Sequence, residues 1–235
     1  MAQPHLGLIV PPAAGAVPVE GGQLYGERYR FSARGLGLSE ISTRGYEEVI
    51  DTVVEKALLL KKEGAEAISL MGTSLSFYRG SAFNRQLEAE MARSTGLPCT
   101  TMTNAIVRGL RHLQVRRVAV ATAYIDEVNQ RLRDYLEQND FEPLALEGLS
   151  ISDVGAVGKV PTHQLVELCI RVFEAQPGAD GILLSCGGLV TLEAVREVEE
   201  RLQVPVVSSS PAGFWDLVRT AGLDARAPGS GMLFA

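Results

Sequence analysis

The sequence predicts an α/β protein of two pseudo-symmetric lobes, each with a central, mostly parallel sheet of about four strands flanked by helices. Three observations predict this fold. Short apolar runs of strand length alternate with longer stretches of helical spacing, as in parallel sheets whose strands are buried on both faces. One strand–turn–helix pattern occurs twice, and 235 residues suffice for two lobes with a sizeable core. We therefore expect the functional site in the cleft between the lobes.

The stretch around Cys186 is the most informative part of the chain. Residues 180–189 read DGILLSCGGL, in which Ile182 to Leu184 predict a buried strand, and helical spacing follows over residues 189–202. Cys186 is therefore expected at the carboxyl end of a strand, where open α/β sheets bind ligands. The two glycines after it allow close approach of a ligand and leave N–H groups free for an anion. A free cysteine buried in a tight turn is the alternative interpretation.

The same pattern occurs earlier in the chain. Residues 64–75 read GAEAISLMGTSL and align without a gap with residues 178–189, GADGILLSCGGL. In this alignment Gly72 stands at the position of Cys186. Two lobes related by a pseudo-twofold axis would place these two residues across one cleft. A chance likeness between two strand ends is the alternative.

The first lobe is assigned to residues 1–114. Its first strand, His5 to Val10, ends at a Pro-Pro turn that cannot continue the ladder. Residues 16–41 are expected to form a long, irregular, glycine-rich loop that serves as a wall or lid over the cleft. The other predicted elements are helices after Ser42 and Gly80, strands at 67–71 and 98–101, and a helix at 104–113.

The second lobe is assigned to residues 115–235. Tyr124 is expected near the end of its first strand, and Pro211 is expected to be the first residue of a helix that can pack back on the first lobe. The tail from Gly222 is expected to be loose. The other predicted elements are strands at 117–122, 142–146, 182–184 and 204–208, helices at 125–136, 165–173 and 189–202, and an irregular stretch at 147–160.

Composition excludes several classes of partner. The net charge of −6 argues against nucleic acid, which requires a basic surface. No apolar run approaches the roughly 20 residues of a membrane span. The start of the chain has no signal-peptide pattern, and the cysteines are few and odd in number, which favours free thiols in the cytoplasm. Neither the cysteines nor the histidines show metal-ligand spacing, so no metal is expected. These residues are Cys99, Cys169, Cys186, His5, His112 and His163.

The polar groups predicted at the strand ends suit the chemistry of a small dicarboxylate. Thr73, Ser74, Tyr124 and the amides near Gly187 can hold a carboxylate and stabilise the enediolate formed when the adjacent carbon becomes carbanionic. The Cys186 thiol can exchange one proton with that carbon on one face only, which suits decarboxylation to a single enantiomer. The hydroxyl groups also have structural interpretations, Thr73 and Ser74 as helix caps and Tyr124 as a boundary residue satisfied by the backbone. A nucleophilic role is the alternative chemistry for Cys186, although no histidine near it in the sequence could serve as its base.

At these residues the sequence resembles the aspartate/glutamate racemase superfamily and, within it, the bacterial arylmalonate decarboxylases. The superfamily's usual pair of cysteines is reduced to one in these decarboxylases, with glycine at the first place, as with Gly72 and Cys186 here. The resemblance covers nearly the whole chain. It is strongest at residues 9–15, 69–80, 97–102, 119–126, 181–189 and 206–215.

The resemblance implies cofactor-free decarboxylation of an α-aryl-α-methylmalonate to an optically pure 2-arylpropionate. It assigns Cys186 as the proton donor. It also implies a dioxyanion hole around the retained carboxylate and an apolar pocket for the departing one. The dioxyanion hole corresponds to Thr73, Ser74, Tyr124 and the Cys186 and Gly187 amides, and the apolar pocket to Pro11, Leu38, Tyr46, Gly72, Val154 and Val157.

Two other functions stay open at this point. A racemase or maleate-type cis-trans isomerase of the same superfamily would need a second acid or base opposite Cys186, and a non-catalytic module would only bind a small carboxylate. Because a helix N-terminus lowers a thiol's pKa, we expect the dianionic substrate to oppose this lowering and keep the thiol protonated. A monomer is expected.

Overall fold

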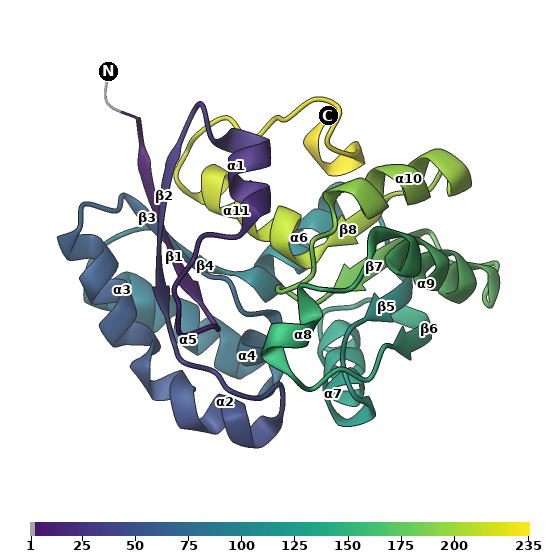
Figure 1. Cartoon of the computed structure of the whole chain (residues 1–235), viewed down its shortest axis with the longest axis horizontal. Helices are drawn as coiled ribbons and strands as arrows, with labels where there is room; N and C mark the ends of the chain where they lie inside the picture. The colour runs from purple at the N-terminus through teal and green to yellow at the C-terminus, as the bar shows by residue number, and fades with distance from the viewer. Residues whose placement is uncertain (1–2) are drawn as a thin grey trace.

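The computed structural model describes residues 3–235 and contains two four-stranded parallel sheets, with strand orders β2-β1-β3-β4 and β6-β5-β7-β8. The predicted fold is therefore confirmed, down to four strands in each lobe. Figure 1 shows the sheets side by side, with helices on their outer faces. The strands are β1 His5–Val10, β2 Arg30–Gly35, β3 Ala67–Leu70, β4 Cys99–Thr101, β5 Arg117–Thr122, β6 Glu142–Gly148, β7 Gly181–Ser185 and β8 Val206–Ser208.

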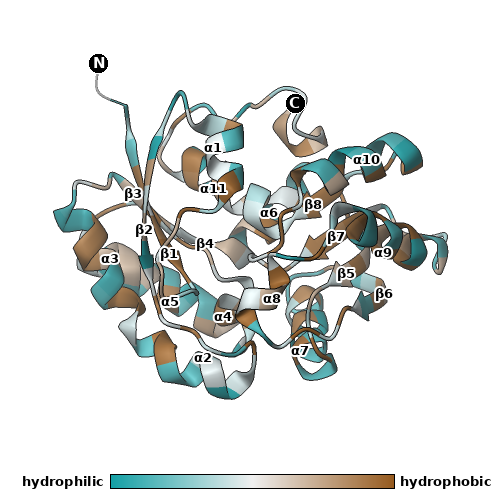
Figure 2. Cartoon of the chain, viewed as in Figure 1, coloured by the Kyte–Doolittle hydropathy of each residue, from teal (hydrophilic) through white to brown (hydrophobic). Residues whose placement is uncertain are grey.

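The inner strands form the core of each lobe because their apolar runs are buried on both faces. Every residue of β1, β3 and β7 is buried. Figure 2 shows hydrophobic colours along these central strands, while the helices alternate between hydrophobic and hydrophilic turns. Continuous burial without alternation is typical of parallel sheets covered by helices on both sides.

The helices connect successive strands, as parallel pairing requires. The first lobe contains α1 Val19–Tyr25, α2 Thr43–Val49, the 3-10 turn η1 Ile50–Thr52, α3 Val53–Lys62, α4 Thr73–Phe77, α5 Gly80–Thr95 and α6 Met102–His112. The second lobe contains α7 Asp126–Glu137, α8 Val154–Val157, α9 Thr162–Glu174, α10 Leu192–Leu202, α11 Ser209–Thr220 and the 3-10 turn η2 Met232–Phe234.

The stretch 16–41 is more ordered than the sequence predicted, and the expectation of an irregular loop is wrong. It contains α1 and the edge strand β2, which pairs with β1 over its whole length. β2 reads RFSARG and is only partly buried, so it lacks the apolar run by which a buried strand is recognised. The stretch 147–160 likewise contains the single turn α8.

The C-terminal region also departs from expectation. α11 begins at Ser209, so Pro211 is its third residue and not its first. The tail is not loose at its end, because Leu233 and Phe234 are buried and the Met232 N–H donates to Glu199 Oε2. The polar composition of the tail gave no sign that Leu233 and Phe234 in η2 would be buried and would fix the end of the chain.

The two lobes share an interface at which α11 packs against α6 of the first lobe. An ion pair joins them, in which the exposed Arg108 side chain places Nη1 2.7 Å from Oδ2 of the buried Asp216. The Thr100 hydroxyl also donates to this carboxylate at 2.6 Å. The division of the chain at residues 114 and 115 stays a prediction. Across residues 3–235, no helix combines the length and apolar character needed to cross a membrane.

Candidate active site

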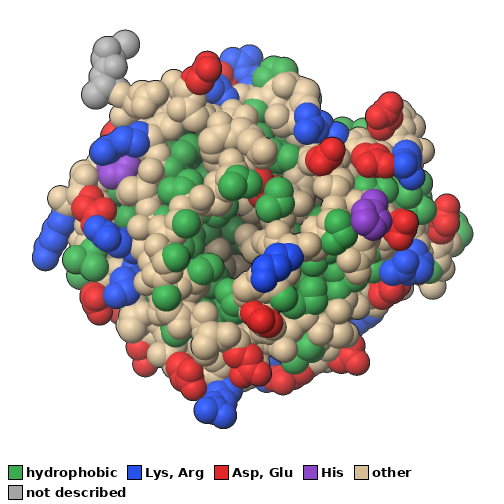
Figure 3. All heavy atoms as spheres, in the orientation of Figure 1, with side chains coloured by type: hydrophobic (Ala, Val, Ile, Leu, Met, Phe, Trp, Pro, Cys, Tyr) green, Lys and Arg blue, Asp and Glu red, His purple; other side chains and the backbone are tan. Residues whose placement is uncertain are grey.

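A cavity of about 330 Å³ lies where strand ends of both lobes meet. Its lining includes the residues after β1 (from Pro11), after β3 (from Met71) and after β7 (from Cys186). Figure 3 shows a hollow near the middle of this face, with hydrophobic side chains gathered around it. The cavity therefore occupies the position at which parallel α/β sheets bind their ligands.

Cys186 lines this cavity, and only 6% of the residue is exposed. Burial raises the pKa of its thiol to about 11, although the Gly188 backbone N–H and the Tyr124 hydroxyl act in the opposite direction. The thiol is therefore protonated near neutral pH. The lowering of the pKa by a helix N-terminus, which the sequence suggested, is weak here because α10 begins only at Leu192 and a turn separates it from Cys186. The expectation that the dianionic substrate opposes such a lowering stays a prediction.

Three of the predicted hydroxyl groups come together near this thiol. Thr73 and Ser74 are the first residues of α4 and line the cavity directly. Tyr124 is completely buried, and its hydroxyl lies 3.4 Å from Ser185 Oγ and within hydrogen-bonding reach of Thr73 and Cys186. Burial raises the pKa of Tyr124 well above its ordinary value, so this hydroxyl remains a donor.

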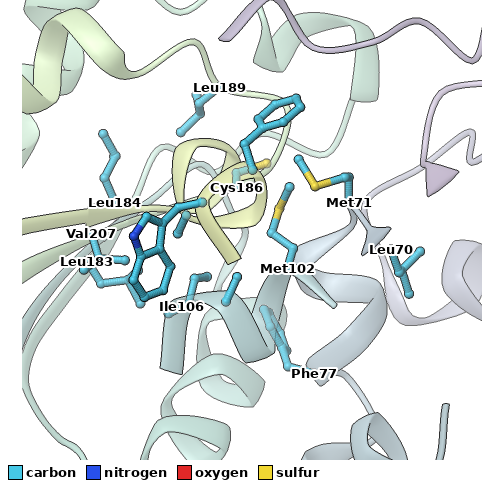
Figure 4. Close-up of a cluster of buried hydrophobic side chains, with 14 of the residues drawn as sticks. Leu70, Met71, Phe77, Met102, Ile106, Leu183, Leu184, Cys186, Leu189 and Val207 are labelled. Atoms are coloured by element: carbon cyan, nitrogen blue, oxygen red, sulfur yellow. The ribbon is translucent and has the colours of Figure 1, made fainter. Parts of the chain in front are cut away.

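Met71 and Met102 pack beneath the predicted carboxylate site. The Thr73 hydroxyl donates to Met102 Sδ at 2.9 Å. A Cβ atom on Gly187 would lie 2.8 Å from the same sulfur, so a larger residue there would displace the end of the Met102 side chain. Figure 4 shows Met71, Met102 and Cys186 gathered around one region of the core. Met102 thus contacts both the Thr73 side of the site and the Gly187 side.

The other end of the cavity is apolar. Of the predicted pocket residues, five line the cavity: Pro11, Leu38, Gly72, Val154 and Val157. Tyr46 lies behind it, with its hydroxyl beside Ser74. The segment after β2 meets the segment before α8 at this end of the cavity. The Ile41 N–H donates to the Ser152 carbonyl at 2.9 Å, and Glu40 forms a β-bridge with Asp153.

Sequence reasoning missed several residues of the site. Ile41, Met71 and Met102 lie at or beneath the cavity wall, and the last two belong to segments already recognised as family-like. Glu20 also lines the cavity. No periodic pattern marks it, because it lies in the stretch expected to be irregular. Within residues 3–235, no group of His, Cys, Asp and Glu side chains is arranged to hold a metal ion.

The fold and the cavity define a class of two-lobed α/β proteins with a thiol at the carboxyl end of a strand. The crystal structure of the maleate isomerase Iso from Pseudomonas putida S16 shares this fold, with a TM-score of 0.92 over 99% of this chain and 98% of that one. The two sequences are 22% identical, so the likeness concerns the fold.

Closer relatives identify the family within this class. The chain belongs to the arylmalonate decarboxylase family, whose model matches residues 6–234. It is 58% identical to the arylmalonate decarboxylase of Bordetella bronchiseptica over 98% of this chain and 96% of that protein. A liganded double mutant of arylmalonate decarboxylase, with one glycine changed to cysteine and one cysteine to serine, matches with a TM-score of 0.97, 57% identity and 99% coverage of both chains. The predicted resemblance is confirmed, as is the prediction of an enzyme of the carboxy-lyase class.

Proposed function

We propose that the chain catalyses cofactor-independent, enantioselective decarboxylation of α-aryl-α-methylmalonates to 2-arylpropionates. The bond between the α-carbon and one carboxylate breaks, and carbon dioxide leaves. The electron pair remains on the α-carbon and spreads into the retained carboxylate as an enediolate. Cys186 then transfers its thiol proton to the α-carbon, and solvent returns a proton to the thiolate.

The observation that carries this proposal is a buried thiol that lines a cavity together with hydroxyl donors and a wall of apolar side chains. A proton donor must hold its proton until the carbanion forms. A thiol with a pKa of about 11 meets this requirement near neutral pH. The thiolate formed afterwards is a strong enough base to recover a proton.

The retained carboxylate would be held by neutral donors. Thr73, Ser74 and Tyr124 supply hydroxyl groups, and the amides of Cys186 and Gly187 supply N–H groups. In the ligand-free arrangement the Thr73 hydroxyl donates to a methionine sulfur, and the Cys186 N–H donates to Ser209 Oγ at 3.2 Å. Both partners are uncharged, so a developing enediolate would be the stronger acceptor. Donors fixed in a buried site stabilise such a charge far more than donors in water.

The departing carboxylate would lie against Pro11, Leu38, Val154 and Val157. An apolar surface offers a carboxylate no hydrogen bonds, whereas carbon dioxide needs none. Loss of charge at this end is therefore favoured.

The product would be a single enantiomer because only one face of the enediolate meets an acid. Gly72, which the internal repeat pairs with Cys186, has no side chain and also lines the cavity. A racemase or isomerase mechanism needs a second acid or base there, so the same glycine argues against those alternatives.

We further propose that the enzyme works as a monomer in the cytoplasm. Cys99, Cys169 and Cys186 are free thiols, which suit a reducing compartment.

Chiral analysis of the product formed from phenylmethylmalonate in deuterated water tests the proposal. The wild-type enzyme should give one enantiomer of 2-phenylpropionate with one deuterium on the α-carbon. Cys186→Ala should abolish turnover, whereas Cys99→Ser, which changes a buried thiol outside the cavity, should leave the product unchanged. Racemic product, or full activity of Cys186→Ala, would contradict the proposal.

A further inference from the structure

Helix α1 connects β1 to β2 of the first lobe but packs against α11 of the second lobe. Figure 1 shows these two helices side by side. A Cβ atom on Gly21 would lie 2.5 Å from the Phe214 ring, so the two helices approach each other closely. At the other end of α1, the Tyr25 hydroxyl donates to the Ala225 carbonyl at 2.7 Å. α1 therefore attaches the first lobe to the second half of the chain.

Glu20, in the first turn of α1, caps the start of α10. Its Oε1 accepts hydrogen bonds from the Thr191 N–H at 2.7 Å, the Thr191 hydroxyl at 2.9 Å and the Leu192 N–H at 3.1 Å. Thr191 is the N-cap residue of α10, but its own side chain makes no capping hydrogen bond. The first N–H groups of a helix have no partner within the helix, and an acidic group there also interacts favourably with the helix dipole. The cap of α10 is therefore supplied by a residue 171 positions away in the chain.

The carboxyl group of Glu20 is held in a buried position, since only 1% of the residue is exposed. Burial raises the pKa of this group, and hydrogen bonds from Ser210, Thr191 and Leu192 oppose the rise. Burying an acidic group is costly unless hydrogen bonds compensate for the lost water. The start of α10 provides this compensation, so Glu20 and Thr191 depend on each other for their buried hydrogen bonds.

Both sides of this attachment continue directly into the wall of the cavity. Residues 16–19, just before Glu20, line the cavity, and so do residues 186–190, just before Thr191. The second of these segments carries the Cys186 thiol. Within residues 3–235, the hydrogen bonds between residues 186–192 and the first lobe all end on Glu20 Oε1. Glu20 thus sets where the turn that carries Cys186 lies relative to the wall contributed by the first lobe.

We propose that Glu20 is a positioning residue which, by joining α1 to the start of α10, holds the Cys186 thiol in its place in the cavity. Its effect on catalysis rests on the proposed decarboxylation, whereas the place of the thiol can be measured without a substrate. Without Glu20, the turn after β7 loses its hydrogen bonds to the first lobe, and the thiol becomes more exposed to water. Water then competes with the thiol to protonate the enediolate, and it can do so from either face.

Alkylation of Cys186 by iodoacetamide at pH 8, followed by peptide mass spectrometry, tests the proposal without a substrate. Glu20→Ala should raise the rate about tenfold or more, because a thiol that loses part of its burial forms the thiolate more readily. Glu20→Gln keeps a carbonyl acceptor for α10, so its rate should stay within about twofold of the wild type. The matched control is Tyr25→Phe, which removes a hydrogen bond of α1 outside the cavity and should lower Tm without changing the rate. A wild-type rate in Glu20→Ala, or an equal rise in Tyr25→Phe, would overturn the proposal.

Chiral analysis of the product from phenylmethylmalonate connects the same variants to catalysis. Glu20→Ala should lower kcat about tenfold or more and should give both enantiomers, because a displaced thiol no longer controls protonation. Partial unfolding would lower the rate but not the enantiomeric purity, so the purity separates positioning from a loss of stability. A single enantiomer formed by Glu20→Ala at the wild-type kcat would overturn the proposal.

Two further outcomes are also decisive. If Glu20→Ala does not fold, Thr191→Val, which removes one of the three donors, should change the alkylation rate and the purity in the same direction by a smaller amount; no change in either would overturn the proposal. If the wild type decarboxylates no arylmalonate, the proposed function fails, and the alkylation rates still decide whether Glu20 positions Cys186.

Discussion

Titration of the Cys186 thiol is the most direct check on the chemistry of the site. Burial holds the pKa of this thiol at about 11, against an ordinary value of 9.0. A rise of this size corresponds to about 3 kcal/mol of preference for the thiol over the thiolate. At pH 8 about one molecule in a thousand would carry a thiolate, compared with about one in ten for an unperturbed group. The thiol form, which the proposed mechanism requires, should therefore predominate at this pH.

The rate of alkylation by iodoacetamide, followed at Cys186 by peptide mass spectrometry, measures this pKa because only the thiolate reacts. The rate should still be rising at pH 9 and should level off only around pH 11. Tyr124→Phe should move the midpoint higher, since this hydroxyl stabilises the thiolate. The sign for stability follows: folding favours the thiol, so its contribution to the free energy of unfolding is full below pH 9 and is lost as the pH rises through 11. A midpoint at or below pH 9 would refute burial as the dominant influence.

Three substitutions test other parts of the structure. Gly72→Cys should introduce racemisation of 2-arylpropionates, because its Cβ meets mainly the flexible end of Leu75; chiral chromatography that detects no exchange between enantiomers would count against the facing arrangement. Gly35→Ala should lower the free energy of unfolding by about 2 kcal/mol or more in a urea titration, since its Cβ would overlap carbonyl oxygens of the turn after β1; an unchanged midpoint would show that this turn can move. Asp216→Ala should cost about 1.5–3 kcal/mol, because it removes the buried carboxylate that accepts hydrogen bonds from Arg108 and Thr100; a loss below about 0.5 kcal/mol would mean that this contact between the lobes contributes little to stability.

The main features of the fold could be predicted because their signals are local. Each inner strand is a short apolar run followed by a turn and helical spacing, as at Ile182 to Leu184. The internal repeat paired Gly72 with Cys186, and both line the cavity. β2 and α1 escaped prediction because a half-buried edge strand and a short polar helix carry no apolar pattern strong enough to mark them.

The amino-acid pattern alone was enough to predict the two-lobed parallel architecture and the position of one thiol at a strand end, because spacing along the chain encodes both features. The family followed from the resemblance of six segments to known proteins. The folded structure was needed to show the burial that raises the pKa of that thiol, the contact of Met102 with both sides of the site and the presence of Glu20 in the cavity wall. These properties depend on burial and on contacts between residues far apart in the chain. Glu20 and Thr191, for example, are separated by 171 positions. A thiol's pKa responds to the atoms packed around it, and no local pattern records which atoms those will be.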